Sequence, residues 1–166
     1  MKTFRLATPV LLILAVFLSC TRDDLCDPGT SVTPLLVINF RDNANPLQSK
    51  NVTNLTVRIN NADSTFVFAT SDPTDSIAIP LDTDRDASNL IFILNDDDNA
   101  ETTNADNLEF TYQRTELYIN RACGFKTTYA NFSADVVDDT DNWITSFQVL
   151  QTEITNDNEA HLTIRF

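Results

Sequence analysis

Apolar residues recur at every second position along almost the whole chain after residue 34. The alternation is clear in four segments, which run over residues 55–59, 77–81, 108–112 and 160–166. A side-chain period of two is typical of a β-strand with one face buried and one face in solvent. Between these segments no stretch has a convincing helical period. The sequence therefore predicts an all-β protein.

Five further segments bring the expected number of strands to about nine. Residues 35–40 and 90–94 are apolar at nearly every position, which predicts central strands covered on both faces. Residues 65–68, 117–129 and 143–150 are the other candidates. The connections are rich in Asn and Asp, which turn the chain in a sequence with only two glycines. We expect an antiparallel two-sheet sandwich, immunoglobulin-like or similar, with a closed β-barrel as the alternative.

The first 19 residues have the layout of an export signal. Lys2 and Arg5 supply positive charge, and an apolar run of nine residues from Val10 to Leu18 follows. A membrane-spanning helix needs about 20 apolar residues, so this run is too short to be one. The sequence Phe17-Leu18-Ser19-Cys20 resembles the lipobox of bacterial lipoproteins, in which the cysteine is acylated and becomes the new N-terminus. An ordinary cleaved signal followed by a chance cysteine is the alternative.

This reading divides the chain into three parts. Residues 1–19 form a lipoprotein signal peptide, residues 20–33 a polar tether lipidated at Cys20, and residues 34–166 a single β domain. Asp23 and Asp24 resemble the acidic signals that send lipoproteins of Bacteroidetes to the cell surface. We expect lipid anchoring at the outer membrane, with the orientation toward the cell surface or the periplasm left open.

The charge of the mature chain argues against two kinds of partner. Cleavage removes two of the 11 basic residues and none of the 24 acidic ones, which leaves a net charge of −15. Binding to phosphate groups needs clustered Lys and Arg. Nucleic acid and anionic lipid head groups are therefore poor partners.

The three cysteines become two once Cys20 carries lipid. An exported chain with an even remainder predicts a disulfide between Cys26 and Cys123. These two residues fit a disulfide better than a zinc site, because no cluster of further ligands accompanies them.

Several segments together resemble a known family. They are Arg22–Cys26, Pro34–Phe40, Asp75–Leu81, Arg121–Lys126, Asn142–Ile144 and Asn158–Leu162. The combination resembles an uncharacterised lipoprotein family of Flavobacteria and related Bacteroidetes, a domain of unknown function. The resemblance implies the export route and the paired cysteines, and it implies no activity.

Few residues suggest chemistry. The single histidine, His161, has the parity of the polar face, so we expect it at the surface or on an edge strand. Asp82, Asp84 and Asp86 alternate as calcium ligands do, but Ala87 stands where an EF-hand needs glycine, and Ile93 stands where it needs Glu. A looser calcium site with residues 95–99 remains open. We expect no metal or other cofactor.

Arg121 shares the parity of apolar neighbours. This predicts an arginine directed at the apolar face, either as an anion-binding group or, preferably, in a bulge or structural ion pair. Exposed aromatic residues would favour glycan binding, and the candidates are Tyr112, Tyr118, Tyr129 and Trp143.

Two classes of function remain. The preferred one is a non-catalytic envelope module that binds a protein or glycan partner or serves a structural role. The alternative is a carboxylate-dependent hydrolase with an unrecognised pair of acids. No motif selects such a pair, so we name no catalytic residue.

Overall fold

The computed structural model describes residues 25–97, 101–137 and 139–166, and the predicted all-β sandwich is confirmed. The signal peptide and Cys20 lie outside the described residues. Nine strands and no helix occur in the described part of the chain. They are β1 (Leu36–Arg41), β2 (Leu55–Ile59), β3 (Phe66–Thr70), β4 (Ser76–Ile79), β5 (Ala87–Leu94), β6 (Asn104–Asn120), β7 (Gly124–Val137), β8 (Ser146–Val149) and β9 (Leu162–Arg165).

The strands form two separate sheets. One has four strands in the order β4-β1-β9-β8, and the other has five in the order β3-β2-β5-β6-β7. One pair differs from the antiparallel arrangement that we expected, because β1 runs parallel to β9, with Ile38 opposite Leu162. A parallel pair needs a long connection between its strands, and here nearly the whole domain provides it.

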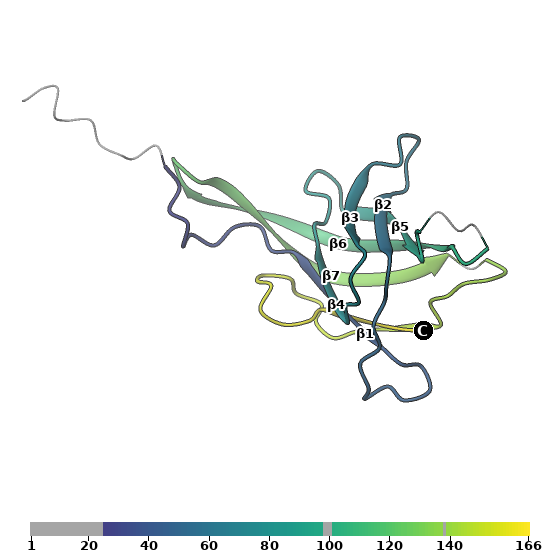
Figure 1. The fold of residues 1–166 in the computed structure, drawn as a ribbon. Helices are drawn as coiled ribbons and strands as arrows, with labels where there is room; N and C mark the ends of the chain where they lie inside the picture. Colours follow the sequence, from purple (N-terminus) through teal and green to yellow (C-terminus); the bar gives the residue numbers. More distant parts are fainter. Residues whose placement is uncertain (1–24, 98–100, 138) are drawn as a thin grey trace, which may run out of the picture. The chain divides into compact units, whose positions relative to one another are not determined.

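The core lies between the two sheets, which face each other in Figure 1. Alternate side chains of both sheets are buried there, as the period of two predicts. Aromatic rings fill the centre, with edge-to-face contacts between Phe92 and Phe110 and between Tyr112 and Tyr129, whose ring centroids are 6.4 and 4.9 Å apart. The two apolar runs do become interior strands, β1 and β5. Coverage on both faces was wrong, however, because every second side chain of each is only partly buried or exposed.

The predicted single strand over residues 117–129 is wrong, because the chain reverses there. The side-chain oxygen of Asn120 accepts the backbone N–H groups of Ala122 and Cys123 at 2.9 and 2.7 Å. Gly124 follows with a φ of +70°, a conformation that a residue with a Cβ rarely adopts. This turn joins β6 to β7, and the part of β7 beyond residue 129 was not predicted.

The chain divides into two compact units. The larger consists of Ser31–Leu117 and Lys126–Phe166 and contains the core. The described part of the smaller consists of residues 25–30 and Tyr118–Phe125. Within the smaller unit, a disulfide joins Cys26 to Cys123, the pair expected from the sequence.

Candidate functional site

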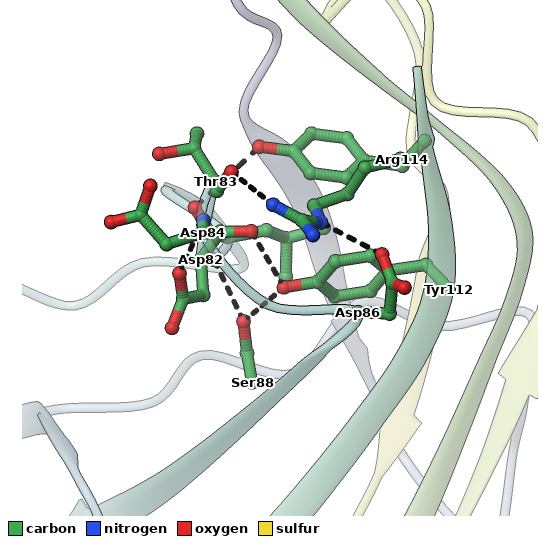
Figure 2. A network of polar contacts seen from close by, with 9 residues as sticks. Asp82, Thr83, Asp84, Asp86, Ser88, Tyr112 and Arg114 are labelled. Carbon is green, nitrogen blue, oxygen red and sulfur yellow. Dashed lines mark hydrogen bonds and ion pairs between the residues drawn. The ribbon is translucent and has the colours of Figure 1, made fainter. Parts of the chain in front are cut away.

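A closed ring of hydrogen bonds holds the loop between β4 and β5. The Asp82 backbone N–H donates to Ser88 Oγ at 2.8 Å, and the Tyr112 hydroxyl donates to the Asp82 carbonyl oxygen at 2.9 Å. The oxygens of Ser88 and Tyr112 are 2.7 Å apart. Because the single Tyr112 proton is already used, the Ser88 hydroxyl donates to Tyr112. Figure 2 shows the ring, in which all three groups are satisfied.

Two further side chains fasten the same loop. Arg114 binds the Asp86 carboxylate through Nε at 2.7 Å and donates from its other end to the Thr83 carbonyl oxygen (Figure 2). The hydrogen bond from Arg114 lowers the pKa of Asp86, so that carboxylate stays charged. Tyr129 reaches the Leu81 carbonyl oxygen at 3.5 Å. Burial raises the pKa of Tyr129 to about 12, which keeps its hydroxyl protonated as a donor.

The loop borders a cleft of about 670 Å³. Its lining combines apolar and polar side chains from β2 and the turn after it, β3, the loop and β5: Ile59, Asn60, Asn61, Val67, Pro80, Leu81, Asp82, Thr83, Asp84, Arg85, Ala87, Ser88, Asn89 and Leu90. Eight of them are exposed, namely Thr83, Asp84 and Arg85 of the loop together with Ile59, Asn60, Asn61, Pro80 and Asn89. None of the lining residues is aromatic. The loop therefore presents charged side chains of both signs, Asp84 and Arg85, on a fixed backbone.

The acidic residues of the loop do not converge on a common point. One carboxylate oxygen of Asp82 accepts the Asp84 backbone N–H at 2.7 Å, and Asp86 is paired with Arg114. Within residues 25–97, 101–137 and 139–166 there is no group of three His, Cys, Asp or Glu that could hold a metal ion. Asp98 and Asn99 of the proposed second ligand loop lie outside the described residues.

The expectation that His161 lies on the surface is wrong, because the residue is 1% exposed. Its Nδ1 accepts the Val37 backbone N–H at 3.0 Å, and Nε2 lies 3.0 Å from the Asn156 carbonyl oxygen. The imidazole is therefore the neutral tautomer with its proton on Nε2. Burial lowers the pKa of His161, which agrees with that state. The alternation of buried and exposed side chains does not hold here. Residues 161 to 164 are all buried, where β9 lies between β1 and β8.

Asp106 on β6 was missed by the sequence analysis. It is 0% exposed, and its two carboxylate oxygens accept the backbone N–H groups of Trp143 and Ile144 at 3.2 and 2.8 Å. Burial raises the pKa of Asp106, although these two donors act in the opposite direction. Its parity with Leu108 was the available signal, since a carboxylate on a core face needs partners.

The structure separates the other candidates. Arg121 is exposed in the turn between β6 and β7, so its predicted direction toward an apolar face is wrong. Tyr112 and Tyr129 are buried, and Trp143 is partly buried with its indole N–H donating to the Phe92 carbonyl oxygen at 3.1 Å. Among the four aromatic candidates, only Tyr118 is largely exposed.

Comparison with known proteins identifies the family. The model of a family of unknown function (DUF6452) matches residues 51–166, and the chain therefore belongs to this family. No curated protein and no solved structure matches the chain. In the described part of the chain, no helix is long and apolar enough to cross a membrane.

We predict that Tyr112→Phe lowers the free energy of unfolding by about 1 to 2 kcal/mol, because it leaves the Asp82 carbonyl and the buried Ser88 hydroxyl without their partner. Ser88→Ala should have a similar effect. The double variant should cost less than the sum, since either change opens the same ring. Urea unfolding measures all three, and Tyr118→Phe, at an exposed tyrosine, is the matched control. Additive losses would contradict the ring.

We predict that His161 makes the domain less stable in mild acid. Above its unfolded pKa of about 6.5, the imidazole is neutral in both states and its contribution is complete. As the pH falls below that value, the unfolded chain takes up a proton that the folded chain refuses until its lower pKa is reached, so stability is lost. The loss cannot exceed about 1.4 kcal/mol for each unit by which the pKa is lowered. Urea unfolding at pH 7.5 and pH 5.5 should show a steeper fall for the natural protein than for His161→Gln, and equal falls would refute the assignment.

Proposed function

We propose that this member of a family of unknown function is a lipoprotein of the outer membrane, held by lipid on Cys20, whose β domain binds a partner without catalysing a reaction. The lipobox-like sequence Phe17-Leu18-Ser19-Cys20 supports the anchor, and Asp23 and Asp24 support outer-membrane sorting. The observation that carries the binding role is the cleft beside a loop whose backbone is fixed by the Tyr112–Ser88–Asp82 ring.

The use of the titratable groups supports a non-catalytic module. A general acid or base must reach the substrate. Both ring nitrogens of His161 and both carboxylate oxygens of Asp106 are taken up by backbone groups, and both residues are buried. The charged Asp86 carboxylate is paired with Arg114. The alternative of a carboxylate-dependent hydrolase gains no support from these residues.

The fixed loop supports recognition. Binding residues commonly lie on loops held by a rigid scaffold, because a loop that is already ordered loses less conformational entropy when its partner binds. Three side chains hold the loop from behind, namely Tyr112, Tyr129 and Arg114, all from the adjacent strands β6 and β7. Thr83, Asp84 and Arg85 remain exposed for a partner.

The lining of the cleft favours a protein over a glycan. Sugar rings are commonly bound on an aromatic face, and the cleft has no aromatic lining residue. Val67 brings the edge strand β3 to the cleft, and an edge strand has backbone groups free to pair with an added strand. The occupant that we propose is an extended segment of a partner protein, bound along β3 and contacting the loop.

We predict that Cys20 is the site of lipid attachment. Cells fed an alkyne-labelled fatty acid should incorporate it into the natural protein and lose the label in Cys20→Ala. Cys26→Ala is the matched control, because it removes a cysteine six positions away and should keep the label. Label retained in Cys20→Ala, or absent from the natural protein, would refute the anchor.

We predict that the cleft contacts a protein in the intact envelope. A photo-crosslinking amino acid at Thr83 should form an adduct when cells are irradiated, and the same group at Ala44, which is exposed and outside the cleft, should not. Arg85→Glu should reduce the adduct several-fold, since it reverses a charge in the cleft. Equal adducts at both positions would count against the cleft, and an adduct resistant to protease but removed by glycosidases would identify a glycan.

A further inference from the structure

The smaller unit carries a group of exposed apolar side chains. Tyr118 is 61% exposed, Phe125 is 65% exposed and Leu25 is 76% exposed. The two aromatic rings are in contact with each other, with centroids 5.2 Å apart and an angle of 63° between their planes. Large apolar side chains grouped in solvent commonly indicate a contact surface for a protein or a membrane.

The disulfide fastens the two chain segments of this group together. Leu25 adjoins Cys26, and Phe125 lies two residues after Cys123, whose Cα is 4.7 Å from that of Cys26. The segment that leads to the N-terminus therefore cannot move away from the turn between β6 and β7. We call Leu25, Tyr118 and Phe125 the apolar tip.

The distance to the anchor limits where the tip can be. The inference rests on the proposed lipid at Cys20, which precedes Cys26 by six residues. Six residues reach at most about 20 Å when fully extended. Since the acyl chains lie in the bilayer, the apolar tip is confined to the neighbourhood of the membrane surface.

The charge of the tip suits that location. The described residues of the smaller unit include one acidic residue, Asp27, and one basic residue, Arg121, so their net charge is zero. The mature chain as a whole has an excess of 15 negative charges. A segment without net charge can enter the interface without attraction to anionic lipids. Tyrosine prefers the headgroup level because its ring is apolar and its hydroxyl polar, and phenylalanine adds apolar surface.

We propose that the apolar tip inserts into the headgroup interface of the membrane that holds the Cys20 lipid. The partner is the bilayer itself, at uncharged headgroups, and the contact is made by Leu25, Tyr118 and Phe125. Together with the disulfide, it gives the lipoprotein a second point of attachment beside the lipid.

The test uses the full lipidated protein in phosphatidylcholine vesicles, with and without bromine on the acyl chains. Tyr118→Trp places a fluorophore in the tip. Phe66→Trp is the matched control, because Phe66 is a similarly exposed aromatic residue on β3, 59% exposed, in the larger unit. The signal of the natural Trp143 is measured in the unsubstituted protein and subtracted.

We expect bromine to reduce the emission of the tryptophan in Tyr118→Trp at least about twofold, because that side chain would lie at headgroup depth, and Phe66→Trp measures the quenching of an exposed aromatic side chain outside the apolar tip. Adding Phe125→Asp should reverse most of the quenching. Equal emission with and without bromine, in protein that carries the fatty-acid label, would overturn the inference while leaving the anchor intact. Protein without the label would refute the proposed function and the inference with it. Shielding of the tip in native envelopes but not in vesicles would identify a protein contact and would also overturn it.

Discussion

The pairing of the first strand with the last holds the four-stranded sheet together. β8 pairs only with β9, and β9 reaches the rest of its sheet only through β1. His161 lies where this pairing begins and satisfies both main-chain groups of Val37. Its ring Nδ1 accepts the Val37 N–H, and its backbone N–H donates to the Val37 carbonyl oxygen. A contact between residues 37 and 161 spans nearly the entire domain, so the sheet is completed only when the last strand is in place. Folds dominated by such distant contacts form slowly.

The region matched by the family model also shows that the four-stranded sheet depends on β1. It begins at residue 51 and therefore leaves out β1, whose strand partners β4 and β9 both lie inside it. Without β1, the parallel partner of β9 and the antiparallel partner of β4 would both be missing. The physical domain is thus larger than the region by which the family is identified.

Buried polar side chains have a common task in this molecule. Asp106, His161 and Tyr112 each bind the main chain of a segment that is distant in sequence, and none has its functional atoms in solvent. A buried polar group without a partner is costly, so each contact selects one placement of the segment it binds. The loop before β5 is fixed in this way by side chains from neighbouring strands, which supports the recognition role that we propose for its exposed residues.

The period of two was sufficient to predict the all-β class, because it reports directly which side chains face a core, and together with the apolar runs and the turn residues it led to the two-sheet architecture. It failed where a residue's burial is decided by neighbours outside its own strand. His161 is buried although the alternation places it on the solvent face. Asp106 is polar although the alternation places it on the core face. The turn at Asn120 and Gly124 could have been found, since Gly124 is one of two glycines in the chain. The ring around Asp82 could not, because it joins residues on three elements whose proximity only the fold creates.

The disulfide connects stability with placement. It closes a loop of 97 residues, which in the chain-entropy model stabilises the folded state by about 4 to 5 kcal/mol. A bond anywhere along the N-terminal segment would give a similar benefit, because the entropy depends only weakly on loop length. Stability alone therefore does not explain why the bond lies at Cys26, only six residues from Cys20. With lipid at Cys20, this position replaces a long flexible linker by a short one and keeps the apolar tip at a high effective concentration near the bilayer. If the proposed lipid holds the tip at the surface, a weak contact of three side chains suffices for the second attachment.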